Sequence, residues 1–290
     1  MPSPRPNRIA HGLDAVEGWQ ALDRIASPLR AAAAPLTAGR RLRNLLSGVL
    51  LGHPVHPALA QLTVGCFLGA GLLDLRGRRG DRGASTALIT TGITTAVPTA
   101  LTGLTDWSHG HEQQQRTGLV HAAGNSTALV LYAATLLRRR RGGSGRLLSV
   151  AALTVSSAAA YLGGHLAFRQ ALGPNHAEHV PHRVPPGWSS LGPVDDLPER
   201  TLVPRTLGDQ PLVAYRDGTG VTVLSDVCPH LSGPLHEGEV RDGCVTCSWH
   251  GSSFRLADGE PVVGPATAPV PTFEVRVEGG HVQVLLPGAG

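Results

Sequence analysis

The chain has 290 residues, which is enough for two domains or for one membrane unit and one soluble unit. Only 16% of the residues are charged and 4% are aromatic, which excludes an ordinary soluble core filled by large aromatic side chains and favours tightly packed membrane helices. Residues 1–189 carry 19 Arg against 8 acidic residues (net +11), whereas residues 190–290 carry 6 against 13 (net −7). Because the arginines flank apolar runs and the acidic part would repel phosphate, we expect no nucleic-acid partner.

The N-terminal region, residues 1–44, predicts a tail and one short helix. The first residues are proline-rich and lack the apolar core of a signal peptide, so we expect them to be disordered. Residues 13–36 show helical amphipathicity, which predicts a helix lying on the membrane surface and broken at Pro28 and Pro35.

Residues 45–173 predict a domain of four transmembrane helices. Each apolar run has nearly the ~20 residues needed to cross a bilayer core. Residues 57–73 contain no charged side chain, whereas a soluble helix of that length would show a polar face. We therefore expect a multi-pass protein of the cell membrane with spans at 57–75, 84–104, 118–137 and 147–168.

An even number of spans places both ends of this domain and the loop between the second and third spans on one face. Nine histidines then gather on the face that also carries the C-terminal part: His53, His56, His109, His111, His121, His165, His176, His179 and His182. Ionisable side chains within spans are candidate functional residues.

The motif His53-Pro54-Val55-His56-Pro57 resembles that of an uncharacterised family of bacterial four-helix membrane domains, a likeness that extends over residues 45–175. It implies an architecture without a known activity. Three interpretations stay open for the histidines, chiefly for His53, His56, His121 and His165. They could bind b-type haem or another metal, form a quinone or proton-handling site, or serve only interfacial hydrogen bonding and helix capping.

The composition and residue pattern of the chain change after the fourth apolar run. Residues 174–187 are rich in His and Pro and predict a semi-rigid linker. Residues 188–290 show short alternating strands separated by Asp-Gly and Gly-Gly turns, which predict a small all-β domain. Two Cys- and His-bearing loops, at 228–235 and 247–252, interrupt this pattern.

The first loop reads Cys-x-His and the second, sixteen residues later, reads Cys-x-x-His, which resembles the two cluster-binding loops of the Rieske family. The resemblance implies a [2Fe–2S] cluster with Cys228 and Cys247 on one iron and His230 and His250 on the other. Structural zinc is the competing interpretation, but zinc sites usually place two Cys close together before two His. Cys244 is expected to be a small buried strand residue instead of a ligand.

Departures from the family narrow the type of centre. The respiratory branch has a further Cys in each loop, whereas here Ser232, Gly233 and Ser248 occupy that neighbourhood, so no such disulfide can form. Ser252 matches a serine that hydrogen-bonds cluster sulfur in the high-potential branch, whereas Phe254 stands where that branch has tyrosine. The resemblance therefore implies a ferredoxin-like centre with a potential below the upper end of the Rieske range of about −150 to +300 mV.

These features predict a membrane-anchored electron-transfer protein that passes single electrons between a membrane haem or quinone and a partner protein. The alternative is a redox-sensing or scaffold module with the membrane domain as an anchor. A component of an oxidoreductase fits both interpretations, but a complete Rieske oxygenase does not, because only forty residues follow His250 and cannot house a mononuclear iron domain.

The side of the membrane on which the C-terminal domain lies stays open. Nine arginines in the first and third loops, against six on the other face, would place the domain outside under the positive-inside rule. No clear twin-arginine signal precedes the first span, and the missing disulfide suits a reducing compartment.

Overall fold

The computed structural model describes residues 8–285, and the proline-rich start at 1–7 lies outside that range. Within it, the chain forms two compact units. The membrane unit comprises residues 8–38 and 55–172, and the C-terminal unit comprises residues 39–54 and 173–285. The C-terminal unit thus includes a segment from early in the chain.

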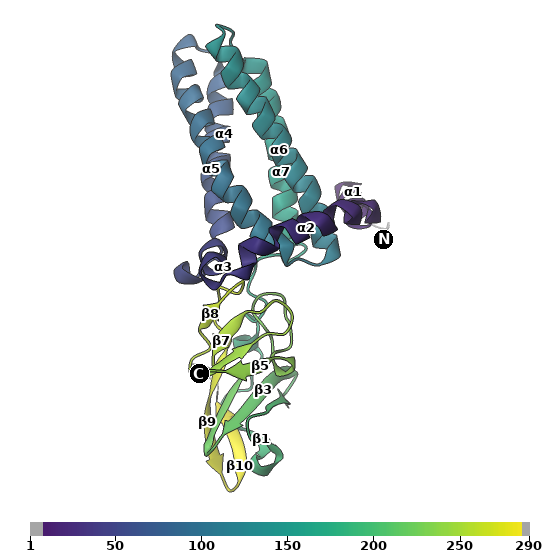
Figure 1. Cartoon of the computed structure of the whole chain (residues 1–290), viewed down its shortest axis with the longest axis vertical. Helices are drawn as coiled ribbons and strands as arrows, with labels where there is room; N and C mark the ends of the chain where they lie inside the picture. The colour runs from purple at the N-terminus through teal and green to yellow at the C-terminus, as the bar shows by residue number, and fades with distance from the viewer. Residues whose placement is uncertain (1–7, 286–290) are drawn as a thin grey trace, which may run out of the picture. The chain divides into compact units, whose positions relative to one another are not determined.

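Four long helices form the body of the membrane unit, as the sequence predicted (Figure 1). All four are long and apolar enough to cross a membrane. They extend beyond the predicted apolar runs because polar and basic residues at their ends continue the helical backbone. Their bounds are Val55–Arg76 (α4), Arg82–Ser108 (α5), Glu112–Arg140 (α6) and Arg146–Phe168 (α7).

The four helices pack as two close pairs, α4 with α5 and α6 with α7, and the pairs meet less extensively through α4 with α7 and α5 with α6. Small residues permit this approach: a Cβ at Gly92 would overlap the ring of Phe67, and one at Gly71 would overlap the side chain of Leu153. Phe67 stacks on Tyr132 with ring centroids 4.1 Å apart and links the pairs at mid-bundle.

Two further helices, Arg8–Glu17 (α1) and Asp23–Ala38 (α2), lie across one end of the bundle (Figure 1). The expected break at Pro28 and Pro35 is wrong, because α2 runs through both. Packing of α2 on α5 and α6, which buries Ala26 and Ala33, offsets the lost backbone hydrogen bonds.

Ion pairs fix these N-terminal helices to the bundle. Asp23 receives two hydrogen bonds of 2.7 Å from Arg116, and Asp14 receives one of 2.7 Å from Arg169. The pair with Arg116 is the stronger support, since its geometry is bidentate and the arginine is buried.

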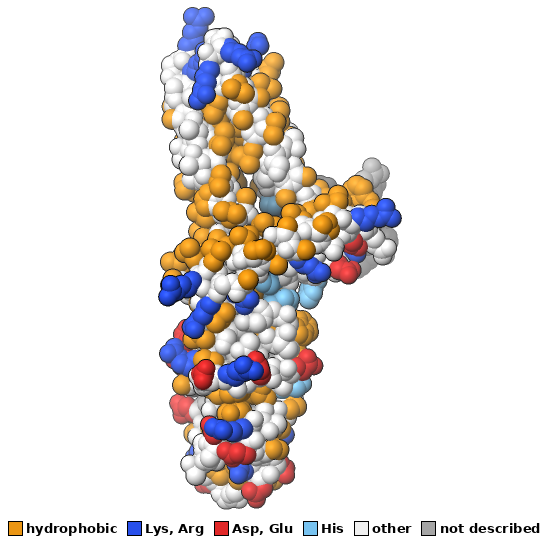
Figure 2. All heavy atoms as spheres, viewed as in Figure 1, with side chains coloured by type: hydrophobic (Ala, Val, Ile, Leu, Met, Phe, Trp, Pro, Cys, Tyr) orange, Lys and Arg blue, Asp and Glu red, His pale blue; other side chains and the backbone are white. Residues whose placement is uncertain are grey.

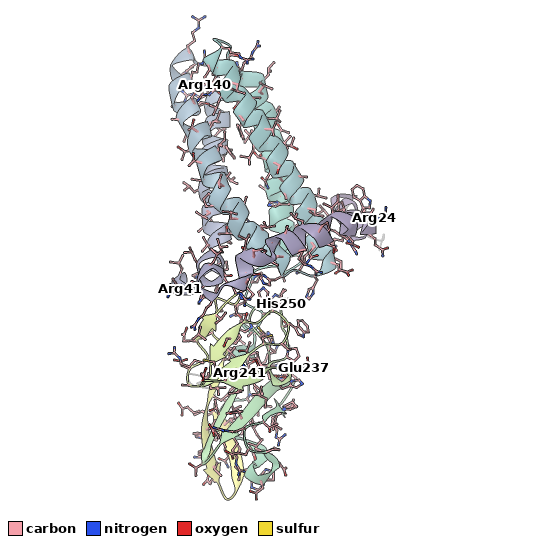
Figure 3. All side chains as sticks on the ribbon, viewed as in Figure 1. Arg24, Arg41, Arg140, Glu237, Arg241 and His250 are labelled. Carbon is pink, nitrogen blue, oxygen red and sulfur yellow. The ribbon has the colours of Figure 1, made fainter. Side chains whose placement is uncertain are left out.

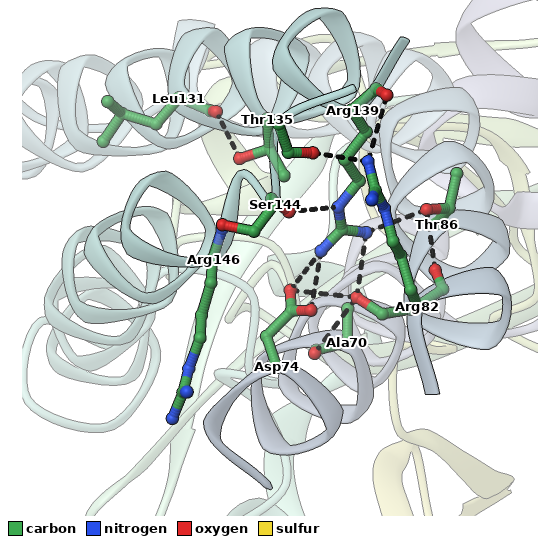
Figure 4. A network of polar contacts seen from close by, with 11 residues as sticks. Ala70, Asp74, Arg82, Thr86, Leu131, Thr135, Arg139, Ser144 and Arg146 are labelled. Carbon is green, nitrogen blue, oxygen red and sulfur yellow. Dashed lines mark hydrogen bonds and ion pairs between the residues drawn. The ribbon is translucent and has the colours of Figure 1, made fainter. Parts of the chain in front are cut away.

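The opposite end of the bundle holds a buried ion pair between Asp74 of α4 and Arg139 of α6 (Figure 4). The guanidinium donates to both carboxylate oxygens at 2.6 and 2.7 Å and also to the hydroxyls of Ser85 and Thr86 at 3.2 and 2.9 Å. Its Nε donates to the backbone of Ser144 at 3.1 Å. This network joins α4, α5 and α6, and every guanidinium nitrogen of Arg139 donates a hydrogen bond in it.

The C-terminal unit is built on two antiparallel sheets. The larger has the strand order β1-β10-β9-β4-β3-β2, and the smaller has the order β5-β6-β7-β8. The larger sheet consists of Ser189–Pro193 (β1), Leu202–Leu207 (β2), Gln210–Asp217 (β3), Gly220–Ser225 (β4), Thr272–Glu278 (β9) and His281–Leu285 (β10). The smaller sheet consists of Glu239–Arg241 (β5), Cys244–Thr246 (β6), Ser253–Arg255 (β7) and Pro261–Val263 (β8). The predicted all-β fold is confirmed.

The two sheets contribute to two hydrophobic clusters. The first includes Leu212, Val223 and Val284 of the larger sheet and also buries Ala177 and Val180 from the stretch predicted as a linker. The second combines Val213 and Leu224 of the larger sheet with Val245 and Phe254 of the smaller sheet, and it includes Cys228 and Cys247. Apolar side chains from both sheets thereby set the position of the two loop cysteines.

Candidate metal centre

The first Cys- and His-bearing loop leaves β4 and folds back on itself before Leu235. The Cys228 amide donates to the Gly233 carbonyl at 2.9 Å, and the Ser232 amide donates to the Cys228 carbonyl at 2.9 Å. Ser232 has a φ of 62°, a left-handed conformation that closes this turn. The fold of the loop turns the side chains of Cys228 and His230 toward the second loop.

The second loop joins β6 to β7 and repeats the same backbone pattern. The Cys247 amide donates to the carbonyl five residues on, at Ser252 (2.8 Å), and the Cys247 carbonyl accepts from the amide four residues on, at Gly251 (3.1 Å). Gly251, with a φ of 72°, occupies the left-handed position that Ser232 occupies in the first loop. The two loops are therefore structurally equivalent.

The four side chains predicted as ligands meet across the two loops in two pairs, Cys228 with Cys247 and His230 with His250. Cys228 and Cys247 are each 2% exposed and lie within hydrogen-bond reach of one another. The rings of His230 and His250 lie 4.9 Å apart, edge to face. One pair of thiols and one pair of imidazoles is the donor set of a two-iron centre with thiolates on one metal and imidazoles on the other.

Electrostatics at the cysteines favour a bound metal. Cys228 donates a hydrogen bond to Cys247, and the amides of Trp249 and His250 point at the same sulfur, which together lower the pKa of Cys247 to about 6. The pKa of Cys228 is raised because it holds the shared proton. Metal binding at both sulfurs releases this proton.

Gly233 shapes the space beside the thiols. A Cβ on this residue would lie 2.9 Å from the Cys247 sulfur and 3.1 Å from the Trp249 ring. Glycine is thus required at position 233 by the close approach of the backbone to these atoms. The donor set, with this space beside it, fits a [2Fe–2S] group.

Asp226 and His236 form a polar contact that sequence reasoning missed. One carboxylate oxygen of buried Asp226 accepts a hydrogen bond from the His236 amide at 2.7 Å. The other lies 2.5 Å from Nδ1 of His236. Burial raises the pKa of the carboxyl, and the contact with His236 opposes that effect. The pair holds the two ends of the first loop together, and an acidic residue just before a Cys-x-His motif was the available signal.

Cys244 lies on β6, half-buried and outside both loops. Its place in the strand agrees with the expected structural role.

Ser252 is fully buried, and its hydroxyl oxygen accepts a hydrogen bond from the Ala266 amide at 3.0 Å. The hydroxyl proton stays available to a second acceptor, so donation to cluster sulfur remains a proposal. Phe254, behind it, belongs to the core.

Replacing Ser252 with alanine should lower the reduction potential, because loss of a donor to cluster sulfur disfavours the reduced state. It should also destabilise the unit by about 1–3 kcal/mol by leaving the Ala266 amide unsatisfied. A redox titration followed by absorbance measures the first effect. Ser253→Ala, at the adjacent hydroxyl, is the control, and an unchanged potential in Ser252→Ala would restrict Ser252 to its structural bond.

In the membrane unit, His56 and His121 have matching surroundings. His56 Nδ1 lies 2.9 Å from the Thr99 carbonyl, with its ring against Gly103, four residues further on. His121 Nδ1 lies 2.7 Å from the Ala159 carbonyl, with its ring against Gly163, again four residues further on. A carbonyl can only accept, so both imidazoles carry their proton on Nδ1 when neutral and keep a lone pair on Nε2.

The other two predicted membrane histidines differ from this pair. His165 is buried and its Nε2 atom bonds to Glu17 of α1 at 2.7 Å. His53 belongs to the C-terminal unit. The structure therefore separates His56 and His121, which lie within electrostatic range of one another, from the rest of the predicted group.

Two equivalent loops, each with one Cys and one His and both set on a small antiparallel sheet, define a Rieske-type iron–sulfur protein. Residues 187–274 match the family described as Rieske [2Fe-2S] domain, and residues 52–176 match the one described as predicted membrane protein (DUF2231). The chain belongs to the Rieske [2Fe–2S] family, and its N-terminal part is the four-helix membrane domain.

Similar proteins include ferredoxin subunits of dioxygenases. The anthranilate 1,2-dioxygenase ferredoxin subunit of Burkholderia cepacia is 34% identical over 97 residues, which are 33% of this chain and 90% of that protein. Ferredoxin CarAc of Metapseudomonas resinovorans is 36% identical over 78 residues, 27% of this chain and 73% of that protein. Among solved structures, the complex of reduced oxygenase and oxidized ferredoxin in carbazole 1,9a-dioxygenase matches with 31% identity and a TM-score of 0.32, covering 34% of this chain and 92% of that one.

Proposed function

We propose that this protein passes single electrons between a donor or acceptor in the membrane and a partner protein. The observation that carries the proposal is that one chain joins a ferredoxin-like Rieske domain, at residues 187–274, to four membrane-type helices. When bound there, a [2Fe–2S] cluster supplies a reversible one-electron carrier. The thiolates would hold one iron, and the imidazoles would hold the other.

The membrane partner is proposed to be a haem or a quinone at His56 and His121. Each imidazole is oriented by a backbone carbonyl, which is the usual support of a ligating histidine and leaves Nε2 as the binding atom. Asn125 lies 3.1 Å from Nε2 of His121, so a ligand there must displace this contact or use it. His165 is the weaker candidate because Glu17 occupies its Nε2 atom.

The partner protein is proposed to be an oxygenase or a comparable soluble redox protein. The match to ferredoxins of dioxygenases supports this choice. Figure 3 shows His250 at the opposite end of the C-terminal unit from the turn between β9 and β10, which are labelled in Figure 1.

Purified protein in nanodiscs tests the proposal by absorbance and electron paramagnetic resonance. We expect the cluster signals together with either haem bands or direct reduction by a quinol. His56→Ala and His121→Ala should each remove the haem bands or slow quinol reduction while leaving the cluster signals intact. His182→Ala, at an exposed histidine of the 174–187 stretch, is the control.

The second candidate function, a redox sensor or scaffold with the membrane unit as an anchor, rests on the same cluster. It predicts the cluster signals without haem bands and without reduction by quinol, so the same two measurements separate the candidates.

A further inference from the structure

The segment just before the first span, residues 39–54, packs on the β domain although more than 120 residues separate them in sequence. It contains Arg40–Ser47 (α3) and the short helix Val49–Leu51 (η2). Asn44 of α3 pairs with the free edge of β8 as a strand would: its Nδ2 donates to the Val262 carbonyl at 3.0 Å, and its Oδ1 accepts from the Gly264 amide at 3.0 Å. One side chain thereby covers an open sheet edge.

Arg43, next to it, reaches the second ligand loop. Its Nη1 donates to the carbonyl of Gly251, the residue after His250, at 3.4 Å and to that of Gly264 at 3.2 Å. A Cβ on Gly264 would lie 3.1 Å from Val49 and 3.2 Å from Ser47, so the backbones meet closely. The segment is thus bonded to the loop that carries His250.

The first ligand loop, residues 228–235, is bonded to the segment that follows α7, the last helix of the membrane unit. The His176 amide donates to the Pro229 carbonyl at 2.9 Å, and its Nδ1 lies 3.2 Å from the Ser232 hydroxyl. His176 follows the end of α7 by eight residues. Both segments that connect to the spans therefore contact the ligand loops within the C-terminal unit.

Residues 39–54 expose four leucines although they pack on the β domain. Leu42, Leu45, Leu50 and Leu51 are 41%, 61%, 82% and 70% exposed. Arg40 and Arg41 are exposed on the same short helix, and Figure 2 shows basic and hydrophobic side chains together over α3. Large exposed leucines beside arginines are typical of helices at a lipid surface.

We propose that residues 39–54 form a lipid-binding clasp whose leucines enter the bilayer surface, while Asn44 holds the edge of β8 and Arg43 holds the loop of His250 against that surface. The proposal rests on α4 being a membrane span, and it does not depend on electron transfer. Leu51 precedes α4 by four residues, which extend at most about 14 Å, so the leucines cannot leave the surface layer of the membrane that α4 enters. Arg40 and Arg41 suit the phosphates of lipid headgroups.

The clasp has a consequence for the redox site. Because Gly251 follows His250 directly, the bonds of Arg43 keep the imidazole loop at the lipid surface, within reach of a carrier dissolved in the membrane. With the loop of His250 in this position, the membrane donor or acceptor has to be one that reaches the surface layer of the bilayer.

Fluorescence quenching of the cluster-loaded, full-length protein in nanodiscs tests the clasp. A bimane label is placed at Leu50→Cys in a Cys66→Ala, Cys244→Ser background and is quenched either by aqueous iodide or by a lipid-confined nitroxide. Leu68→Cys on α4 is the lipid reference, and Val277→Cys on β9 is the aqueous reference. All three positions are exposed.

We expect the label at Leu50→Cys to match that at Leu68→Cys within about twofold in quenching by the nitroxide and to be protected from iodide. Quenching like that at Val277→Cys overturns the proposal, and so does protection from both quenchers, which indicates a protein partner or a second copy as the occupant. The result is independent of haem bands and quinol reduction, so failure of the clasp and failure of the proposed function are distinguishable.

A second measurement tests the hold on the β domain. Asn44→Ala with Arg43→Ala should lower the fluorescence anisotropy of the label at Val277→Cys, because the domain reorients more freely once its edge bonds are lost. Arg205→Ala, which removes an exposed arginine that donates to the carbonyls of Pro204 and Asp196, is the control. Unchanged anisotropy in the double variant contradicts the clasp.

Discussion

Cys228→Ala should abolish the visible absorbance and the paramagnetic resonance signal of the [2Fe–2S] cluster. The variant removes one of two thiolates and leaves Cys247, His230 and His250, a set that cannot complete the coordination of the first iron. The loss should be complete at every expression level and after anaerobic reconstitution. Iron and sulfide analysis should give values near zero in the same samples.

Cys244→Ser is the matched control, since Cys244 is a cysteine on β6 of the smaller sheet and lies outside the ligand loops. Its spectrum should equal that of the wild type. Retention of the full cluster signal in Cys228→Ala, or its loss in Cys244→Ser, would refute the assignment of ligands.

Asp74→Ala should be the most destabilising single substitution in the membrane unit. It leaves Arg139, whose guanidinium is buried, without its carboxylate, and breaking a buried pair in this way costs about 3–5 kcal/mol. The free energy of unfolding, measured by denaturant titration in mixed micelles, reports the effect. Arg140→Ala, at the exposed neighbour of Arg139, should change it by less than about 0.5 kcal/mol.

The double variant Asp74→Leu, Arg139→Leu separates the value of the pair from the cost of an orphaned charge. We expect it to be markedly more stable than Asp74→Ala, because two apolar side chains of similar volume leave no buried charge. A double variant no more stable than the single one would show that the bonds to Ser85, Thr86 and Ser144 carry the network.

The parts of the fold that depend on local pattern could be predicted from the sequence. Length and the exclusion of charge predicted four long helices, and the resemblance of the Cys-x-His and Cys-x-x-His motifs to the Rieske family implied the fold of the C-terminal domain. The continuity of α2 could not be predicted, because packing of Ala26 and Ala33 outweighs the effect of Pro28 and Pro35.

The remaining features depend on contacts between distant residues. The pairing of Asn44 with Val262 and Gly264 spans about 220 residues and has no periodic signature. Similarly, the motif that contains His53 and His56 gave no sign that the two would belong to different units. A single sequence shows which side chains can bond, whereas the fold decides which of them meet.

The matching anchors of His56 and His121 have a mechanical meaning. Each bond joins an imidazole to the partner helix within one close pair: His56 on α4 to Thr99 on α5, and His121 on α6 to Ala159 on α7. The less extensive contacts lie between the pairs, so the bundle widens most easily there. Such widening changes the distance between the two imidazoles. It leaves the tautomer of each ring unchanged, because each ring stays bonded within its own helix pair.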